Sequence, residues 1–258
     1  MKPFYFYHRA IQALQAIVLN EIDKLDAENP DSYQQLKTLI FDVFSQEEFT
    51  SLYFELASAV GNKVYGSCEN ICLQTTPTPR LLYPGSHGTS VHCDYWYGHG
   101  LSAYTIWVPI LNCISGATFN ADFAGAYSQM INSKEFSHKD LTNIGEYLDS
   151  NGDEVLPSVG SCFVFDSTTL HGSRVNKTNR LRLSFDFRIS KEIDTTSTKD
   201  LLNYYHYDNA RSMFFIPTHS LSGKNCLKYI CGGKGKNTYA QHIIICLLYT
   251  SPSPRDAT

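Results

Sequence analysis

Long apolar runs are missing from this sequence. No stretch reaches the roughly 18 apolar residues of a membrane-spanning helix, and the first residues, MKPFYFYHRAIQALQ, lack the apolar core of a signal peptide. A basic surplus is missing too: 21 Lys and Arg stand against 25 Asp and Glu, a net charge of −4, which excludes a strongly basic nucleic-acid-binding surface. We therefore expect a cytoplasmic protein with neither membrane nor nucleic-acid partners.

Paired metal-binding cysteines are also absent. The eight cysteines do not fall into the repeated CxxC pattern of structural zinc sites, and without a secretory segment we expect reduced thiols rather than disulfides. With 258 residues, of which 43% are hydrophobic and 18% charged, the chain has the composition of an ordinary folded protein and is long enough to bury a substantial core.

Helical spacing dominates the N-terminal quarter. Apolar residues recur every three or four positions from about residue 10 to about residue 60, which predicts an N-terminal helical segment over 1–62. Ser45 and Glu48 have the spacing of a capping box at the start of the last of these helices. Gly61 is expected to end it.

Strand-like segments follow over 63–190. Short β-branched or aromatic runs, such as AYTIWVPIL and GSCFVFD, are bounded by Gly, Pro, Asn and Asp, and no long helix separates the runs between 70 and 125. Asn151-Gly152 predicts a tight hairpin. Helices followed by antiparallel strands predict an α+β chain with a β-sandwich or jelly-roll core.

The C-terminal part carries no motif. We expect residues 191–245 to form an extension to the core. Residues 246–258 contain CLLYTSPSPRD, which resembles the translation of a sequencing adapter. We therefore treat this tail as an artefact that replaces the natural C-terminus, and we exclude it from the interpretation of the fold.

The segment RLRLSFDFRIS alternates without interruption between apolar and polar residues. Such alternation predicts a strand with one face in the core and the other in solvent or in a pocket. The apolar face comprises Leu181, Leu183, Phe185, Phe187 and Ile189. The polar face comprises Arg180, Arg182, Ser184, Asp186 and Arg188.

A candidate metal site precedes this strand. In an extended segment, His92 and Asp94 point to the same side, and His171 follows a buried-looking strand far downstream. Two imidazoles and one carboxylate suit Fe(II) and leave one side of the ion open for a chelating 2-oxo acid and for O2. The second carboxylate of such an acid needs a cation, which Arg182 offers as a planar fork, with the Ser184 hydroxyl beside it.

These motifs carry a family resemblance. The order HxD, then His-Gly, then Arg-x-Ser about ten residues later resembles the signature of Fe(II)/2-oxoglutarate-dependent oxygenases, which are built on a double-stranded β-helix. The segments TPTPRLLYPG, HCDYWYGH, IWVPI and FDSTTLHGS extend the resemblance over about residues 70–190. They are similar to the phytanoyl-CoA-hydroxylase-like branch, and within it to oxygenases of carbohydrate and aminoglycoside-type biosynthetic clusters.

The resemblance implies both the chemistry and the roles. It implies that His92, Asp94 and His171 bind Fe(II), and that Arg182 with Ser184 binds 2-oxoglutarate, with Arg180 as the rival anchor. The implied reaction is hydroxylation of a small polar metabolite, such as a sugar or aminocyclitol derivative. A carboxylate ligand, rather than a small residue in its place, favours hydroxylation, or a related oxidative step, over halogenation.

Several alternatives stay open. The chain can be a cupin-like metalloenzyme that does not use 2-oxoglutarate, or a non-catalytic jelly-roll module that binds carbohydrate. His99 competes as a ligand or as a neighbour of the site. Thr105 and Trp107 can face the metal or pack in the core, and Arg80 can bind an anion or form a surface ion pair. The aromatic run of residues 95–97 can form a wall on which a sugar ring stacks, or can simply pack.

Overall fold

The computed structural model describes residues 1–22, 32–68, 71–125, 144–158, 160–191, 194, 196–199 and 205–208. Most of the extension expected over 191–245, and all of the tail 246–258, lie outside these residues. The helices are α1 (Arg9–Ile22), α2 (Ser32–Phe44), α3 (Glu47–Tyr65), α5 (Ile144–Asn151) and the short 3-10 helix η1 (Asp94–Tyr97). None of the described helices is long and apolar enough to cross a membrane.

The strands of the described part form two antiparallel sheets. The larger sheet has the order β1-β7-β4-β9-β2-β10, with β3 also paired to β9. Its strands are β1 (Phe4–Tyr7), β2 (Ile71–Gln74), β3 (Thr78–Leu82), β4 (Tyr104–Pro109), β7 (Ser161–Asp166), β9 (Arg182–Lys191) and β10 (Tyr205–Asp208). The smaller sheet has the order β6-β5-β8, with strands β5 (Phe119–Ala121), β6 (Asp153–Glu154) and β8 (His171–Ser173).

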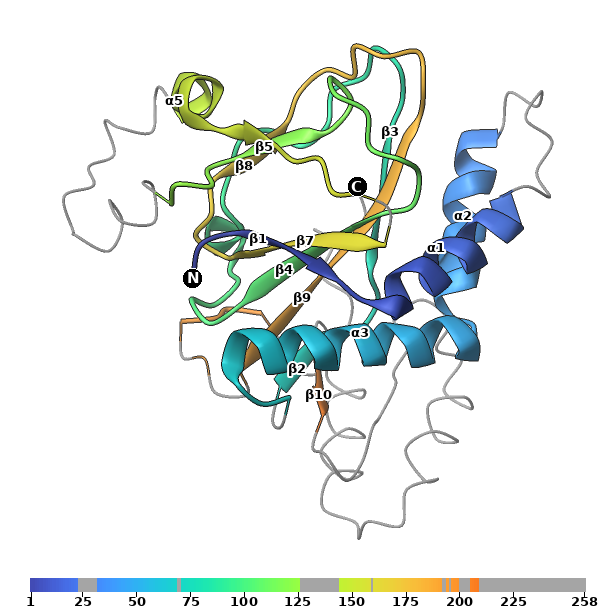
Figure 1. Cartoon of the computed structure of the whole chain (residues 1–258), viewed down its shortest axis with the longest axis vertical. Helices are drawn as coiled ribbons and strands as arrows, with labels where there is room; N and C mark the ends of the chain where they lie inside the picture. The colour runs from blue at the N-terminus through green and yellow to red at the C-terminus, as the bar shows by residue number, and fades with distance from the viewer. Residues whose placement is uncertain are drawn as a thin grey trace, which may run out of the picture.

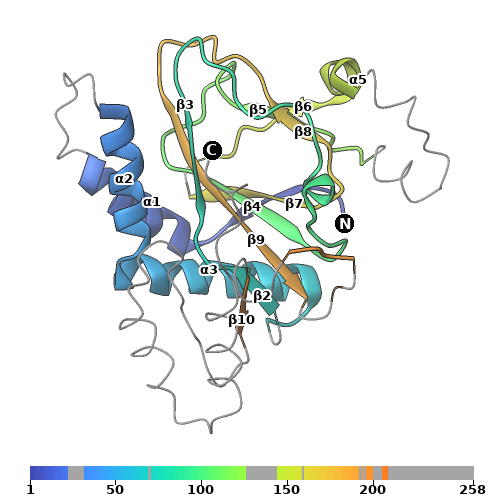
Figure 2. The same cartoon turned by 180° about the vertical axis from the view of Figure 1, so that it is seen from behind.

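The outer face of the larger sheet is covered by the N-terminal helices. Figures 1 and 2 show α1, α2 and α3 gathered on one side of this sheet, away from β5, β8 and α5. The Tyr53 ring of α3 meets the Phe187 ring of β9 edge to face, with centroids 4.7 Å apart. Phe49 packs in the same way on Phe185 at 5.7 Å. Burial of these large rings is the main force that fixes the helices to the sheet.

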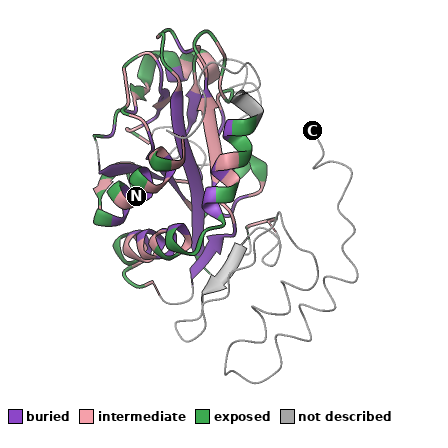
Figure 3. Cartoon of the chain, turned by 90° about the vertical axis from the view of Figure 1, so that its right-hand side faces the viewer, coloured by how far each residue is buried: buried purple, intermediate pink, exposed green. Residues whose placement is uncertain are grey.

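The inner face of the larger sheet looks toward the smaller sheet. Trp107 of β4 packs on Phe119 of β5 with centroids 5.0 Å apart, and Phe165 of β7 lies 6.4 Å from the same ring. Figure 3 shows the central strands buried, in purple, while the exposed residues, in green, lie on helices and loops. Both faces of β9 are therefore buried, one under helices and the other between the sheets.

The expected combination of N-terminal helices and antiparallel strands is confirmed, with three local corrections. The capping box is wrong: Gln46 caps α3 without a side-chain hydrogen bond, and the Ser45 hydroxyl donates to the Asp42 carbonyl instead. Gly61 does not end α3, which continues to Gly66 in the left-handed region at φ 80°. A side chain at position 61 would press on Ile71, so this glycine serves the packing of α3.

The tight hairpin expected at Asn151-Gly152 is also wrong. Asn151 is the last residue of α5, and the Gly152 amide donates to the Leu148 carbonyl to close the helix. The N-terminal strand β1, which pairs with β7, was not expected from the sequence. The five cysteines in the described part are free thiols, in agreement with the composition.

Candidate metal centre

His92 and His171 are paired by two backbone hydrogen bonds. Each amide donates to the other's carbonyl at 2.8 Å, so these two residues form an isolated antiparallel bridge between distant segments. Gly172 makes this approach possible, because a Cβ at that position would lie 2.8 Å from the Val91 Cα. The bridge brings the two imidazole rings to 4.3 Å between centroids.

Both imidazoles are held in one tautomer. The Nδ1 of His92 lies 2.6 Å from the Ser90 carbonyl, and the Nδ1 of His171 lies 3.0 Å from the Thr169 carbonyl. A carbonyl accepts only, so each Nδ1 carries the proton and each Nε2 keeps its lone pair. Metal-binding histidines are usually oriented in this way, by a hydrogen bond from the nitrogen that does not bind the metal.

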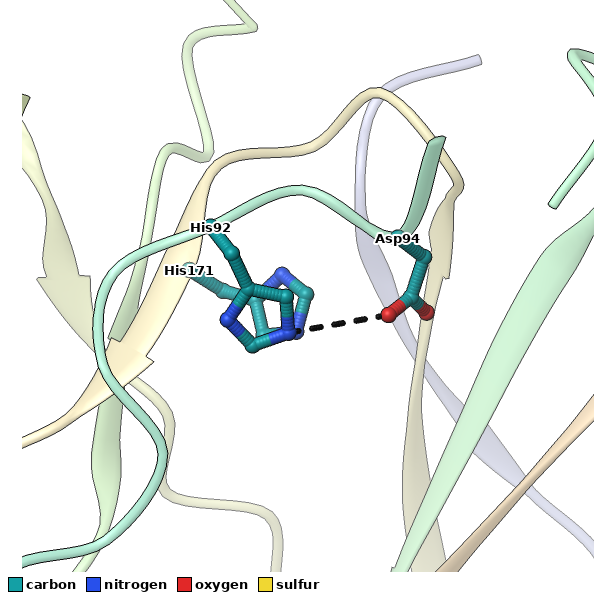
Figure 4. Close-up of side chains that lie close together, drawn as sticks. All are labelled: His92, Asp94 and His171. Atoms are coloured by element: carbon teal, nitrogen blue, oxygen red, sulfur yellow. Dashed lines mark ion pairs between the residues drawn. The ribbon is translucent and has the colours of Figure 1, made fainter. Parts of the chain in front are cut away.

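Asp94 approaches the pair from the first residue of η1. Cys93 keeps an extended backbone, at φ −119° and ψ 150°, so His92 and Asp94 point to one side as the HxD spacing predicts. The Asp94 Oδ1 lies 3.7 Å from the His92 Nε2. A dashed line marks this pair in Figure 4. One ligand atom from each of His92, Asp94 and His171 lies within 4.8 Å of the others, and all three residues are buried. This arrangement can hold one metal ion.

The protonation states suit metal binding. Burial lowers the pKa of His171 to about 4, so the imidazole is neutral at neutral pH. Burial opposes ionisation of Asp94, but the Arg188 guanidinium outweighs it and holds the pKa of this carboxyl well below its usual range. The set therefore offers a neutral nitrogen donor from His171 and one anionic oxygen from Asp94.

A pocket opens beside this centre, between the two sheets. It contains the rings of His92 and His171 together with side chains from the inner face of the larger sheet. Those side chains are Arg80, Thr105, Trp107, Phe165, Arg182, Asp186 and Arg188. The polar face of β9 is thus a pocket wall, which answers the question that the alternation of the sequence left open.

Arg182 and Ser184 are buried on this face with unused hydrogen-bonding capacity. The Arg182 Nε and the Ser184 Oγ have no hydrogen-bond partner among the described residues. Burial and the nearby Arg80 lower the pKa of Arg182 to about 10, which still leaves it charged at neutral pH. Arg182 lines the pocket, whereas Ser184 is buried beside it without lining it, and Arg180 is exposed in the turn before β9 and does not line it.

Four side chains around the centre carry roles that were not assigned from the sequence. Arg188 donates to Asp94 and to Asp186, and Arg80 donates to the other side of Asp186. The Thr105 hydroxyl donates to the Asp94 Oδ2. The pocket-facing alternation of β9 contained the signal for Asp186 and Arg188, but it did not say which polar residues bind each other and which bind a ligand.

The remaining candidates lie next to the centre. His99 is buried but is outside the three-residue group, and burial together with Arg188 lowers its pKa to about 3. Tyr95, Trp96 and Tyr97 are exposed on η1, and the Tyr97 ring meets the His92 ring edge to face at 5.0 Å. These aromatic residues therefore form part of the surface beside the centre.

No family model and no curated protein matches this chain. Solved structures that it resembles include the non-heme alpha ketoglutarate dependent epimerase SnoN from nogalamycin biosynthesis, at 15% identity and a TM-score of 0.44, over 72% of this chain and 77% of that one. EctD from S. alaskensis with 2-oxoglutarate and 5-hydroxyectoine is 12% identical, with a TM-score of 0.43 over 74% of this chain and 72% of that one. The non-heme monooxygenase ThoJ in its Ni complex is 15% identical, with a TM-score of 0.44 over 94% and 95%. The function of the centre is therefore argued from its own geometry.

Proposed function

We propose that this chain is an Fe(II)/2-oxoglutarate-dependent oxygenase that hydroxylates a small polar metabolite. Its core would be a double-stranded β-helix of the phytanoyl-CoA-hydroxylase-like branch, formed by the two facing antiparallel sheets. The reaction converts the substrate C–H bond, O2 and 2-oxoglutarate into an alcohol, succinate and CO2. O2 is the oxidant and takes two electrons from the C–H bond and two from 2-oxoglutarate, and a bound Fe(II) would supply the means to activate it.

The donor set supports a borderline divalent ion such as Fe(II). His92, Asp94 and His171 contribute two neutral nitrogens and one anionic oxygen from one side of the site. Three protein ligands leave coordination positions for a chelating acid and for O2. The hydrogen bonds from each Nδ1 to a carbonyl keep the two Nε2 atoms ready to bind, without rearrangement.

The unsatisfied polar atoms of Arg182 and Ser184 carry the proposal that the cosubstrate is an acid. A buried donor without a partner costs about 1–3 kcal/mol, and more when it is charged, so such groups usually serve a ligand. Arg182 lines the same pocket as His92 and His171. A carboxylate that bonds the guanidinium and accepts from the Ser184 hydroxyl would remove this cost, and 2-oxoglutarate has that carboxylate at the end opposite to its chelating keto acid.

The protein has three tasks in this reaction. Arg182 and Ser184 bind and orient the acid. The two histidines and Asp94 hold the ion at one end of the acid, and the rings of Trp107, Phe119 and Phe165 keep that end of the pocket dry. Exclusion of water protects a reactive oxidant from side reactions.

The substrate class rests on the resemblance to oxygenases of carbohydrate and aminoglycoside-type clusters. Exposed Tyr95, Trp96 and Tyr97, beside the metal ligands, support it, because aromatic faces can stack on sugar rings. A metalloenzyme without an acidic cosubstrate, or a carbohydrate-binding module without a metal, would leave the buried Arg182 without a function. No observation on the described residues favours either alternative.

The proposal is tested by product formation. The Fe(II)-loaded chain is incubated with 2-oxoglutarate, O2 and a panel of sugars and aminocyclitols, and succinate is measured together with the oxidised product. We expect succinate that depends on iron and rises with a subset of the panel, and none from the His171→Ala variant. Succinate formation that is equal in wild type and His171→Ala would contradict the proposal.

A further inference from the structure

The metal ligand Asp94 is held by a second layer of side chains. The guanidinium of Arg188 straddles its carboxylate: Nε lies 3.1 Å from Oδ2, and Nη2 lies between the two oxygens, 3.2 Å from Oδ1 and 3.1 Å from Oδ2. The Thr105 hydroxyl donates to Oδ2 as well. All three side chains are buried, with exposed fractions of 2% for Asp94, 5% for Arg188 and 2% for Thr105.

The hydrogen bonds to Asp94 determine which of its two carboxylate oxygens remains available to a metal. A carboxylate oxygen has two acceptor directions. Both directions of Oδ2 are used, by Arg188 Nε and by Thr105 Oγ1. Oδ1 receives a single donor from Arg188 and is the oxygen that faces His92 Nε2, at 3.7 Å. The carboxylate can therefore offer a metal one oxygen, in the direction of the two histidines.

Arg188 is itself held in place by Asp186, on the side away from Asp94. Its remaining nitrogen, Nη1, donates to Asp186, and Arg80 of β3 donates to both oxygens of that carboxylate. The sheet register brings these side chains together. Thr105 of β4 lies opposite Arg188 of β9, and Arg80 of β3 lies opposite Ser184, two residues before Asp186 on the same face of β9. The planar guanidinium is suited to this task because its donors have a fixed fork geometry that lysine lacks.

We propose that Arg188 is a positioning residue for the metal centre. It holds Asp94 so that Oδ1 alone faces the two histidines, which keeps the carboxylate a ligand through one oxygen and preserves the coordination positions that a chelating cosubstrate needs. The inference rests on the proposed metal site and adds to it the residue that orients one of the ligands.

A competing role for Arg188 predicts the opposite sign. If the guanidinium acted only as a positive charge near the ion, its removal would strengthen metal binding, because like charges repel. If it orients Asp94, its removal lets the carboxylate turn and weakens binding, as loss of a residue behind a metal ligand commonly does by about 10–100-fold. The sign of the change in affinity therefore separates the two roles.

The test is an anaerobic titration of the full chain with Co(II) alone, followed by the visible d–d absorption of the bound ion. We expect Arg188→Met to raise the Kd for Co(II) by about 10–100-fold and to change the shape of the absorption, because the coordination changes. Arg188→Lys should recover only part of the affinity, since it restores the charge without the fork. Arg9→Met, which removes an exposed arginine paired with Glu55, is the matched control and should bind Co(II) like wild type.

Thr105→Val provides a second test of the inference, which can be used if Arg188→Met does not fold. It removes one donor from Oδ2 and should raise the Kd by about tenfold, the low end for a hydrogen bond to a charged group. Unchanged or tighter Co(II) binding with an unchanged spectrum, in folded Arg188→Met or in Thr105→Val, would overturn the inference while leaving the metal site in place. Failure of the wild type to bind Co(II) would overturn the proposed function as well.

Discussion

The two faces of β9 are both buried but are stabilised in different ways. The outer face is apolar, and its side chains fill the core beneath the helices. The inner face is polar and comprises Arg182, Ser184, Asp186 and Arg188. Asp186 and Arg188 bind each other, whereas the Arg182 Nε and the Ser184 Oγ have no partner among the described residues. The outer face therefore stabilises the fold, while part of the inner face costs stability because it buries polar atoms without a partner.

The largest expected effect is on the outer face. Phe187→Ala removes a fully buried ring that packs on Tyr53, and should lower the free energy of unfolding by about 3–5 kcal/mol. Chemical denaturation measures this loss. The folded fraction should bind Fe(II) as tightly as wild type does, and weaker binding by that fraction would show that the two faces are not independent.

The next effect is at the metal ligands. His171→Ala removes one nitrogen donor and should weaken Fe(II) binding by more than about 100-fold, beyond the range expected for residues behind the ligands. An anaerobic Fe(II) titration measures it. The free energy of unfolding in the absence of metal should fall by less than in Phe187→Ala. Near-normal Fe(II) affinity in His171→Ala would remove this residue from the centre.

Arg182→Met should stabilise the ligand-free protein and weaken the binding of 2-oxoglutarate. These opposite effects sharpen the comparison between the two faces. The guanidinium, whose Nε has no hydrogen-bond partner among the described residues, is replaced by an apolar chain, so the ligand-free protein should gain up to about 1 kcal/mol of stability. The Kd for 2-oxoglutarate should rise by about 10–100-fold, because a buried charge-assisted pair is lost. Thermal denaturation and calorimetric titration measure the two changes. A large loss of stability without an effect on 2-oxoglutarate would make Arg182 a structural residue.

The smallest effect is on the pH dependence of stability. Burial lowers the pKa of His99 to about 3, so in the folded metal-free protein it stays neutral at pH 5, whereas in the unfolded chain it takes up a proton below about pH 6.5. The unfolded state then binds more protons, and the free energy of unfolding falls as the pH drops from about 6.5 to about 5. His99→Gln should reduce this fall by about 1–2 kcal/mol. An unchanged pH profile in His99→Gln would contradict the low pKa.

The sequence predicted that His92, Asp94 and His171 meet better than it predicted local turns. Alternation in RLRLSFDFRIS placed the residues of β9 on their correct faces, because the two-residue period of a strand is set by the backbone. The HxD spacing brought His92 and Asp94 to one side for the same reason. The hairpin predicted from Asn151-Gly152 does not form, because Asn151 is the last residue of α5. Tertiary context outweighs the preference of a dipeptide.

The partners of the polar residues could not be predicted. The sequence did not show that Arg188 binds Asp94, because this contact depends on how a loop before η1 meets the middle of β9. It favoured Arg182 but left Arg180 open as a rival, because the two differ only in whether they fall inside β9 or in the turn before it. These distinctions depend on the register and on the end of a single strand, and residue spacing alone does not determine either.

An anaerobic titration of the Fe(II)-loaded chain with 2-oxoglutarate tests the central claim most directly. We expect a weak visible charge-transfer band that saturates with 2-oxoglutarate in the wild type, and that requires much more 2-oxoglutarate in Arg182→Met although iron remains bound. A wild-type protein that binds iron but gives no band at any concentration of 2-oxoglutarate would contradict the claim, as would equal affinities in the wild type and Arg182→Met.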